Sequence, residues 1–343
     1  MFIEISLIQN KMDFIAIVGL IIIIYNLVYM IFPWFLDCDL NLALHERFGK
    51  PISSLKDKVV WITGASSGIG EHLAYVLAEN GCKLILSARR ETELERVKDN
   101  CLQRNANLRS CDVEVLVLDI CDLDKHEPAF NSIITKFGKL DILVNNAGRS
   151  QRALWEDIEI SVDKEMFDLN VFSPIALSRL VAKYFCKMNA GHFVVTSSIA
   201  GITGASFSAT YCANKFALHG YYKTLGIERL DKNISITMVC PGPVYTDFLA
   251  KAFTNKSNEV YKKNTKNDTK NKISPERCAT LMGIAIANNL LEVWICKPFV
   301  LQLAYLNIYY PNVGQWITKK IGTKFLQYLR DSEVTIKTDT TEK

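Results

Sequence analysis

The sequence predicts an α/β fold: a doubly wound parallel sheet of about seven strands, preceded by an N-terminal transmembrane helix. Short runs rich in β-branched residues alternate with helical segments over residues 51–297. This alternation is typical of parallel strands joined by crossover helices. Glycine-rich or polar turns follow several of these runs, and a long uncharged stretch precedes all of them.

The composition fits one large domain and argues against several kinds of function. The 343 residues carry a formal net charge of +4, which is too small to indicate a nucleic-acid partner. The ten cysteines are scattered and form no Cys-x-x-Cys pair, so neither a metal site nor a redox pair is predicted. We interpret these cysteines as free thiols that fill space in the core.

The N-terminal segment predicts a membrane anchor and linker over residues 1–50. The run from Phe14 to Leu36 is almost wholly apolar and carries no charge, and about 20 such residues suffice to cross a bilayer as a helix. Trp34 and Phe35 stand near its end, where an aromatic belt would lie. Bulky residues at that end do not fit a signal-peptide cleavage site, so we expect a retained, single-pass anchor.

The side of the membrane on which the domain lies stays open. Lys11 is the basic residue before the apolar run, whereas four basic residues follow between positions 47 and 58. This asymmetry favours a cytosolic domain. Glycosylation sequons begin at Asn233, Asn255 and Asn267, but about three are expected by chance in this chain, so they do not decide the side.

A glycine-rich turn joins the first predicted strand, 58–63, to a helical segment. Glycines let the backbone approach a ligand closely, and the free N–H groups of a helix start hold a pyrophosphate. A turn of this kind between strand and helix predicts a dinucleotide-binding, Rossmann-type fold, with a purely structural turn as the alternative. Its candidate cofactor residues are Gly64, Ser66, Ser67, Gly68, Ile69 and Gly70.

The end of the second strand, 83–87, indicates the kind of dinucleotide. Many NAD sites have an acidic residue here that holds the adenosine ribose, but this chain has Ala88 followed by Arg89 and Arg90. An arginine at this place accommodates the 2′-phosphate of NADP. The sequence therefore favours NADP(H), the alternative being that both arginines are surface charges at a helix start.

Polar residues also follow the later strands. Asp119 comes after strand 114–118, Asn145 ends strand 141–144, and Ser198 comes after strand 193–195. Because parallel strands end at one edge of a sheet, we expect these side chains to meet in one crevice. Strands 235–239 and 292–295 complete the predicted sheet.

The remaining connections predict one long helix at 163–188, with Asn170 in its first half and a kink at Pro174. A lysine- and asparagine-rich insertion at 251–272 is expected to be mobile and to lie near the site. Ser274 is expected to cap the helix that begins at Pro275.

Tyr211 and Lys215 form the candidate catalytic pair. They are one helical turn apart, so their side chains share a face. A nearby positive charge favours the phenolate and lowers the pKa of tyrosine from about 10, which suits a general acid or base. The spacing alone is a weak signal, and it gains weight from the strand ends expected beside it.

The C-terminal part divides into an apolar, aromatic segment at 298–330 and a polar tail at 331–343. The first segment is interrupted by polar residues and does not fit a second membrane span. We expect it to cap a substrate pocket or to lie in the membrane interface, with simple packing onto the domain as the alternative. The tail is expected to be disordered.

Together these motifs resemble the short-chain dehydrogenase/reductase superfamily over about residues 56–296. The match comprises Thr63-Gly-x-x-x-Gly-x-Gly70, Asn145-Asn-Ala-Gly148, Asn170, Ser198, Tyr211-x-x-x-Lys215 and Pro241-Gly242, in the family's order and spacing. The anchor, the Ala88-Arg89 signal and the aromatic tail are similar to the branch that contains 11-beta-hydroxysteroid dehydrogenase type 1.

The resemblance implies a role for each catalytic residue. Tyr211 would exchange a proton with the substrate oxygen, and Lys215 would bind the nicotinamide ribose and lower the pKa of Tyr211. Ser198 would orient the carbonyl, and Asn170 would hold a water that relays protons. The implied cofactor contacts are the glycine turn at the phosphates, Arg89 at the 2′-phosphate, Asp119 at the adenine, Asn146 at the ribose, and Val244 and Thr246 at the nicotinamide.

These implications lead to one main hypothesis: a membrane-anchored reductase that uses NADPH on an apolar carbonyl compound such as a steroid or retinoid. One alternative is an NAD-dependent alcohol dehydrogenase working oxidatively. Another is a membrane-tethered binding protein without turnover. The expected partners are a small apolar carbonyl or alcohol, membrane lipid and, by analogy, a second copy of the chain; the expected location is the endoplasmic reticulum membrane.

Overall fold

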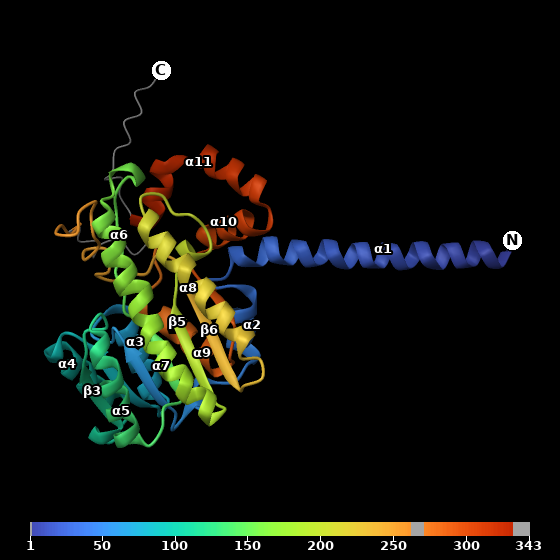
Figure 1. Ribbon diagram of the computed structural model, residues 1–343. Helices are drawn as coiled ribbons and strands as arrows, with labels where there is room; N and C mark the ends of the chain where they lie inside the picture. Colours follow the sequence, from blue (N-terminus) through green and yellow to red (C-terminus); the bar gives the residue numbers. More distant parts are fainter. Residues whose placement is uncertain (1, 262–270, 332–343) are drawn as a thin grey trace.

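A computed structural model, which describes residues 2–261 and 271–331, contains a seven-stranded sheet in the order β3-β2-β1-β4-β5-β6-β7 (Figure 1). All neighbouring strands are parallel. The predicted doubly wound sheet is therefore confirmed. Its strands are β1 Val59–Thr63, β2 Lys83–Ala88, β3 Val113–Val117, β4 Ile142–Asn145, β5 Gly191–Thr196, β6 Ile234–Pro241 and β7 Glu292–Ile295.

The sheet separates two hydrophobic cores. Side chains alternate across a strand, so Val60 and Ile62 of β1 belong to one core and Val59 and Trp61 to the other. The first core is covered by α2 Leu40–Phe48, α3 Gly68–Glu79, α4 Glu91–Arg104 and α9 Pro275–Ala287. The second is covered by α5 His126–Phe137, α7 Ser173–Met188 and α8 Ala209–Glu228.

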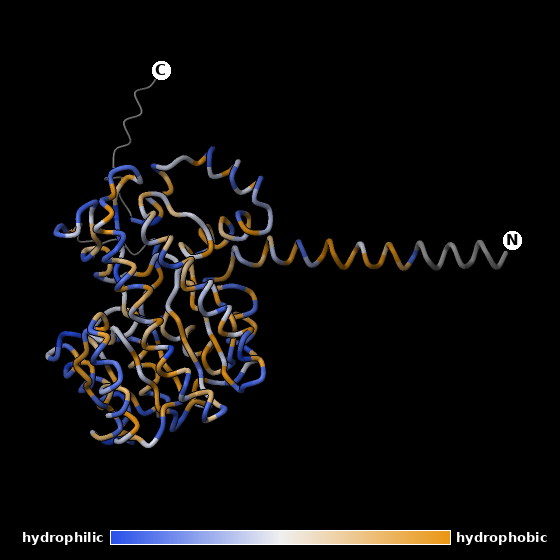
Figure 2. The backbone as a smooth tube through the Cα atoms, in the orientation of Figure 1, coloured by the Kyte–Doolittle hydropathy of each residue, from blue (hydrophilic) through white to orange (hydrophobic). Residues whose placement is uncertain are grey.

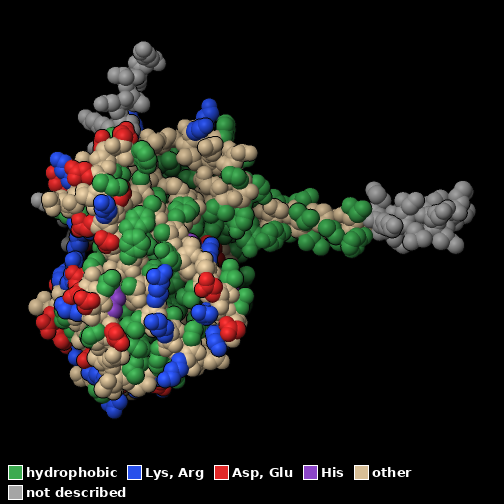
Figure 3. All heavy atoms as spheres, viewed as in Figure 1, with side chains coloured by type: hydrophobic (Ala, Val, Ile, Leu, Met, Phe, Trp, Pro, Cys, Tyr) green, Lys and Arg blue, Asp and Glu red, His purple; other side chains and the backbone are tan. Residues whose placement is uncertain are grey.

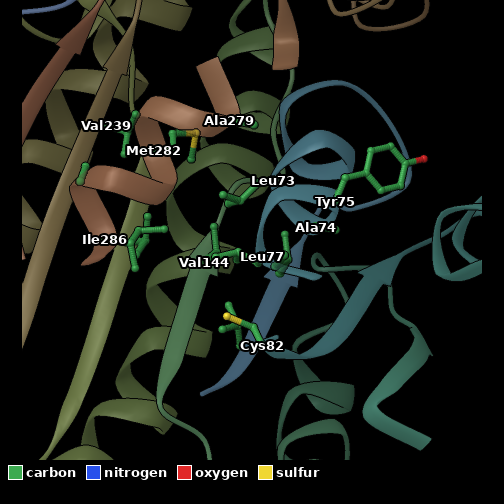
Figure 4. Close-up of a cluster of buried hydrophobic side chains, with 14 of the residues drawn as sticks. Leu73, Ala74, Tyr75, Leu77, Cys82, Val144, Val239, Ala279, Met282 and Ile286 are labelled. Atoms are coloured by element: carbon green, nitrogen blue, oxygen red, sulfur yellow. The ribbon is translucent and has the colours of Figure 1, made fainter. Parts of the chain in front are cut away.

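Packing between α3 and α9 fixes the helix that follows the glycine turn. Leu73 and Leu77 of α3 face Met282 of α9 above Val144 of β4 (Figure 4). All four side chains are fully buried, and burying each such side chain stabilises a fold by roughly 1.5–3 kcal/mol. The start of α3 is thus held firmly at the carboxyl end of β1.

The strand order places a ligand crevice between β1 and β4. From β1 the chain proceeds outward to β2 and β3, then returns to β4 and proceeds outward on the other side. Ligands bind such sheets at this reversal, beyond the carboxyl ends of the strands. The glycine turn after β1 and the Asn145-Asn146 turn after β4 therefore flank the crevice.

The segment 163–188 is not the single helix that the sequence predicts. Helix α6 Ile160–Phe167 runs into a π-helical turn, Asp168–Phe172, and α7 begins only at Ser173. Pro174 has no backbone N–H and occupies the first turn of α7, where no such donor is needed. The irregularity therefore lies before the proline, and it contains Asn170.

The N-terminal helix α1 Phe2–Ile31 projects from the rest of the protein (Figures 1 and 2). The apolar stretch Asp13–Trp34, which runs slightly past the end of α1, has a mean hydropathy of 2.6 and is almost wholly unburied, so it is a candidate membrane span. The base of α1 contacts the C-terminal helices. The ring centroids of Tyr29 and Tyr305 are 6.0 Å apart, and the Tyr310 hydroxyl donates a hydrogen bond of 2.5 Å to Asn26.

The C-terminal segment is helical: α10 Pro298–Tyr309 precedes α11 Pro311–Asp331, which is bent at Gly322, where φ is +78°. Apolar side chains are frequent on the described, inner part of the projecting helix and continue over the adjoining part of the domain (Figure 3). Asp331, predicted to begin a disordered tail, is instead buried at the end of α11 and paired with Arg152. Residues 332–343 lie outside the described residues.

The predicted mobile insertion is only partly described. Its first part, 251–261, is bound to the domain: Phe253 is buried, its N–H donates to the carbonyl of Ser150, and its carbonyl accepts from the N–H of Arg152. This part is therefore held in place, which its polar composition did not predict. Residues 262–270 of the insertion lie outside the described residues.

Candidate active site

The start of α3 is open to an anion. Ser67 occupies the N-cap position, but its side chain makes no capping hydrogen bond, so it does not block the first N–H groups of the helix. These N–H groups and the positive end of the helix dipole attract a phosphate group. The turn before them lies directly at the end of β1.

Two glycines of this turn allow a close approach to the end of β4. Gly64 has a φ of +69°, and a Cβ atom there would lie 2.8 Å from Cα of Ala147. A Cβ atom on Gly70 would lie 2.5 Å from Nδ2 of Asn146. Real Cβ atoms do not approach this closely, so any larger residue would push the two strand ends apart.

Asn146 holds the turn with its whole side-chain amide. Its Nδ2 donates to the carbonyls of Thr63 and Gly64 at 3.2 and 3.3 Å. Its Oδ1 accepts from Oγ1 of Thr196 at 3.1 Å. The side chain predicted to meet the ribose therefore also joins the ends of β1, β4 and β5.

The two arginines after β2 differ in their surroundings. Nη2 of Arg90 donates to Oγ and the carbonyl of Ser66, at 3.1 and 3.3 Å, and so braces the glycine turn. The Arg89 side chain is 75% exposed, and its Nη1 lies 3.9 Å from a carboxylate oxygen of Asp119. Of the two arginines, Arg89 is therefore the one whose charge is more accessible to a ligand.

The loop after β6 closes the other side of the crevice. Cγ2 of Thr246 lies 3.3 Å from the position that a Cβ atom on Gly68 would take, and Val244 pairs with Ile273. The open cavity between the two sides has a volume of about 1180 Å³. Of the predicted cofactor residues, all except Gly70 line it: Gly64, Ser66, Ser67, Gly68, Ile69, Arg89, Arg90, Asp119, Asn146, Tyr211, Lys215, Val244 and Thr246.

Ser198 and Tyr211 meet at the end of this cavity. Ser198 follows β5, and its hydroxyl donates to the carbonyl of Pro241 at 3.2 Å. Tyr211 lies in the first turn of α8, with its ring centroid 6.0 Å from that of Phe248. Ser198 lowers the pKa of Tyr211 and so favours the ionised form of the phenol. The two hydroxyl groups are thus placed to meet one substrate oxygen.

The pKa of Tyr211 lies above its usual value, not below it as the sequence predicts. Burial raises the pKa of Tyr211 to about 12, while Ser198 and the positive charge of Arg152 offset part of this rise. Lys215 lies 5.6 Å from the ring centroid, with its Nζ bonded to the carbonyl of Thr196 at 2.7 Å. Burial also lowers the pKa of Lys215 to about 8.

Asn170 is predicted to be catalytic but does not line this cavity. Its Oδ1 accepts from the N–H of Arg149, and its Nδ2 donates to the Arg149 carbonyl and to Oδ1 of Asn214, each at 2.9 Å. Gly148 lies between Asn170 and Lys215. A Cβ atom on Gly148 would be 3.0 Å from Oδ1 of Asn170 and 4.0 Å from Nζ of Lys215. The π-helical turn therefore brings Asn170 to the Lys215 side of the site.

A second cavity, of about 440 Å³, begins at the same two hydroxyl groups. The apolar segment 298–330 was expected to cap a substrate pocket, to lie in the membrane interface or to pack onto the domain, and its helices α10 and α11 supply one wall of this cavity. Sequence reasoning missed the polar part of the wall, because these residues come from a loop and a helix end that carry no recognisable motif. That part includes Ser150, Arg152, Ser208, Arg330 and Asp331.

Known proteins share this architecture. The profile of the short chain dehydrogenase family matches residues 58–257. A crystal structure of a short-chain dehydrogenase from Streptomyces avermitilis is 25% identical, with a TM-score of 0.62, and the match covers 78% of this chain and 99% of that one. A short-chain dehydrogenase/reductase from Burkholderia phymatum, determined in complex with NAD, is 24% identical with a TM-score of 0.65, over 76% and 96% of the two chains.

Two curated relatives match most of the chain. Dehydrogenase/reductase SDR family member 7 of Mus musculus is 43% identical over 299 residues, which cover 86% of this chain and 87% of the relative. The Homo sapiens protein of the same name is 41% identical over 293 residues, covering 85% and 86%. The family resemblance predicted from the motifs is confirmed, and the chain belongs to the short-chain dehydrogenase/reductase family.

Proposed function

We propose that this protein is a membrane-anchored carbonyl reductase that uses NADPH on apolar ketones or aldehydes such as steroids or retinoids. The observation that carries the proposal is that Ser198 and Tyr211 line both cavities. A carbonyl group entering from the smaller cavity meets both hydroxyl groups at the end of the larger one. Such a junction suits hydride transfer between a bound cofactor and a substrate.

The larger cavity fits a nicotinamide dinucleotide phosphate. The uncapped start of α3 suits the pyrophosphate, and the glycines of the turn leave space for it. Arg89 is free enough to meet a 2′-phosphate, and Thr246 lies at the opposite wall. When bound, this cofactor supplies the hydride, while the protein supplies position and electrostatics.

The protonated state of Tyr211 at neutral pH is compatible with the reductive direction. A tyrosine whose pKa is about 12 keeps its proton at neutral pH, and reduction needs a protonated donor beside the carbonyl oxygen. Ser198 would hold that oxygen, and Tyr211 would deliver the proton to it. Lys215 would bind the ribose and, with Asn170, return a proton to Tyr211.

The walls of the smaller cavity support an apolar substrate. Ile199, Ile202, Leu303, Leu326 and Leu329 are among the residues that line it. Helix α10, which supplies Leu303, also contacts the base of α1. A lipid-soluble carbonyl compound would therefore find the cavity close to the membrane that holds the anchor.

We further propose that the exposed aromatic face of the C-terminal helices touches the lipid surface. Tyr309 and Trp316 are each 62% exposed, and Val313 is 48% exposed. Tyrosine and tryptophan are favoured at the headgroup level of a bilayer. The endoplasmic reticulum remains the membrane expected from the family branch, and pairing with a second copy remains an expectation by analogy.

Substitution of Tyr211 by phenylalanine tests the proposed reaction. Membranes containing Tyr211→Phe should bind NADPH as the wild type does but should not reduce any of a panel of steroid, retinoid and simple apolar carbonyl compounds. Tyr221→Phe is the matched control, because Tyr221 lies on the same helix, is 41% exposed, and should leave turnover unchanged. Retained turnover in Tyr211→Phe would contradict the proposed role.

A further inference from the structure

A buried ionic cluster joins the loop after β4 to the end of α11. Nε and Nη2 of Arg152 each lie 3.3 Å from Oδ1 of Asp331. Nε and Nη2 of Arg330 bond to the same carboxylate at 2.9 and 2.7 Å. The side chains of Arg152, Arg330 and Asp331 are 9%, 17% and 0% exposed. Two guanidinium groups and one carboxylate leave this cluster with one positive charge.

The cluster holds the start of the helix that carries Tyr211. Nη1 of Arg152 and Nη1 of Arg330 both donate to Oγ of Ser208, at 2.8 and 3.0 Å. Ser208 is the N-cap residue of α8, three positions before Tyr211. Arg152, Asp331 and Tyr211 also line the same cavity. A fixed positive charge therefore lies on the substrate side of the tyrosine hydroxyl.

Arg152 is too fully engaged to bind the substrate directly. Besides Asp331 and Ser208, its guanidinium donates to Oγ of Ser150 at 2.7 Å and to the carbonyl of Gln151 at 2.8 Å. A guanidinium has five N–H donors, and these contacts use most of them. Its influence on the reaction must therefore pass through its charge.

We propose that Arg152 is a positioning residue for Tyr211: its buried positive charge, fixed by Asp331 at the end of α11, favours release of the tyrosine proton. This inference rests on the proposed reaction, in which the O–H bond of Tyr211 breaks and a new one forms at the substrate oxygen. The negative charge left on the phenol oxygen is then stabilised by the nearby cation. The C-terminal helix thereby becomes part of the catalytic apparatus.

The titratable groups around Tyr211 agree with this assignment. Arg152 lowers the pKa of Tyr211, while Cys212 on α8 and Cys240 on β6 act in the opposite direction. Nζ of Lys215 lies 5.6 Å from the ring centroid of Tyr211 and donates to the carbonyl of Thr196. Tyr211 and Asp331 in turn favour the charged form of Arg152, against its burial and the repulsion of Arg330. Arg152, Arg330 and Lys272 line the smaller cavity together with Tyr211, and of these cations Arg152 lowers the pKa of the tyrosine.

Two substitutions separate a role through charge from a merely structural one. Arg152→Gln changes the cluster charge from +1 to 0, so the pKa of Tyr211 should rise, by about one unit or more for a cation this near. Asp331→Asn changes it from +1 to +2, so the pKa of Tyr211 should fall. A structural role would move both variants in the same direction, because both lose the same ion pair.

The pKa of Tyr211 can be followed without turnover. Tyrosine labelled with ¹³C at Cζ reports ionisation by NMR in the full-length, detergent-solubilised protein, and Tyr211→Phe identifies the resonance. The rising limb of kcat/KM for alcohol oxidation should move to higher pH in Arg152→Gln and to lower pH in Asp331→Asn. Unchanged values, or shifts of the same sign, would overturn the inference.

A third variant keeps the test decisive if either substitution prevents folding. Arg330→Gln also removes one positive charge but leaves Arg152 and Asp331 paired, so a smaller rise in the pKa of Tyr211 is expected, and no rise would overturn the inference. Failure of the proposed function is distinguishable from failure of this inference, because the former would appear as retained turnover in Tyr211→Phe. The NMR titration does not depend on that result.

Discussion

The ammonium group of Lys215 donates a 2.7 Å hydrogen bond to the carbonyl of Thr196, the last residue of β5. The lysine therefore joins α8 to the carboxyl end of β5, with its Nζ 5.6 Å from the ring centroid of Tyr211. Burial lowers the pKa of Lys215 to about 8 from the ordinary value of 10.5. The buried ammonium group of Lys215 therefore lowers the free energy of unfolding, and this loss can be measured.

Replacement of Lys215 by methionine should therefore abolish turnover and stabilise the fold. Because the folded-state pKa is the lower one, Lys215 weakens the folded state fully below pH 8, and the effect disappears as the pH rises to 10.5. A shift of this size corresponds to about 3 kcal/mol, and the orphaned Thr196 carbonyl costs about 1 kcal/mol. The melting temperature should rise at pH 7, and the gain should shrink above pH 8.

The control for this prediction is Lys183→Met, on the exposed side of α7. It should change neither activity nor the pH dependence of melting. A fall in the melting temperature of Lys215→Met at pH 7 would show that the hydrogen bond to Thr196 outweighs the burial of the charge.

Gly70 should tolerate no side chain. A Cβ atom there would lie 2.5 Å both from Nδ2 of Asn146 and from the carbonyl oxygen of Gly64. Gly70→Ala should thus displace the glycine turn, lower the melting temperature and weaken NADPH binding at least tenfold. Gly220→Ala is the matched control, since a Cβ at Gly220 meets nothing within 4 Å and alanine is favoured over glycine in a helix by about 1 kcal/mol.

Sequence patterns predicted the part of the site at the strand ends, because each motif there lies next to a strand. The apolar runs define the strands, the parallel topology brings their carboxyl ends together, and residues such as Gly64 and Ser198 follow directly. The spacing of Tyr211 and Lys215 fixes the face of the helix but not the direction of the lysine side chain. The contact of Lys215 with Thr196, and the burial that raises the pKa of Tyr211, required the structure.

Contacts between distant segments could not be predicted in this way. Arg152 and Asp331 are 179 positions apart, and their pairing depends on the path of α10 and α11 around the smaller cavity. Composition placed Asp331 in a solvated tail, since a carboxylate is rarely buried unless it is paired. The partner that makes burial tolerable lies in a loop without a motif.

The two arginines after β2 should affect cofactor binding differently. Arg89→Ala should weaken NADPH binding by roughly 10- to 100-fold and leave NADH binding unchanged, because a charge-assisted hydrogen bond to the 2′-phosphate is worth about 1.5–3 kcal/mol. Arg90→Ala should weaken both cofactors equally, because Arg90 braces Ser66 in the turn common to both. Isothermal titration calorimetry gives the four affinities. Equal losses of both cofactors in Arg89→Ala would favour the NAD-dependent alternative.

The linker after the anchor should depend on one buried carboxylate. Oδ2 of Asp39 accepts from the N–H of Trp294 at 2.7 Å, and Oδ1 accepts from the N–H of Leu42 at 2.9 Å. Asp39→Ala leaves both N–H groups without these partners, at a cost of about 1–3 kcal/mol each. The melting temperature should therefore fall, and proteolysis between the anchor and α2 should become faster.

Asp39→Asn separates the two hydrogen bonds from the charge. Asparagine keeps one acceptor oxygen, so it should lose about half of the stability that alanine loses. Burial raises the pKa of Asp39, so the carboxylate opposes folding increasingly as the pH rises above its ordinary value of 3.8, and the neutral amide removes that opposition. The deficit of Asp39→Asn should accordingly be smaller at pH 7 than at pH 4, whereas a deficit that grows with pH would mean that the negative charge itself stabilises the linker.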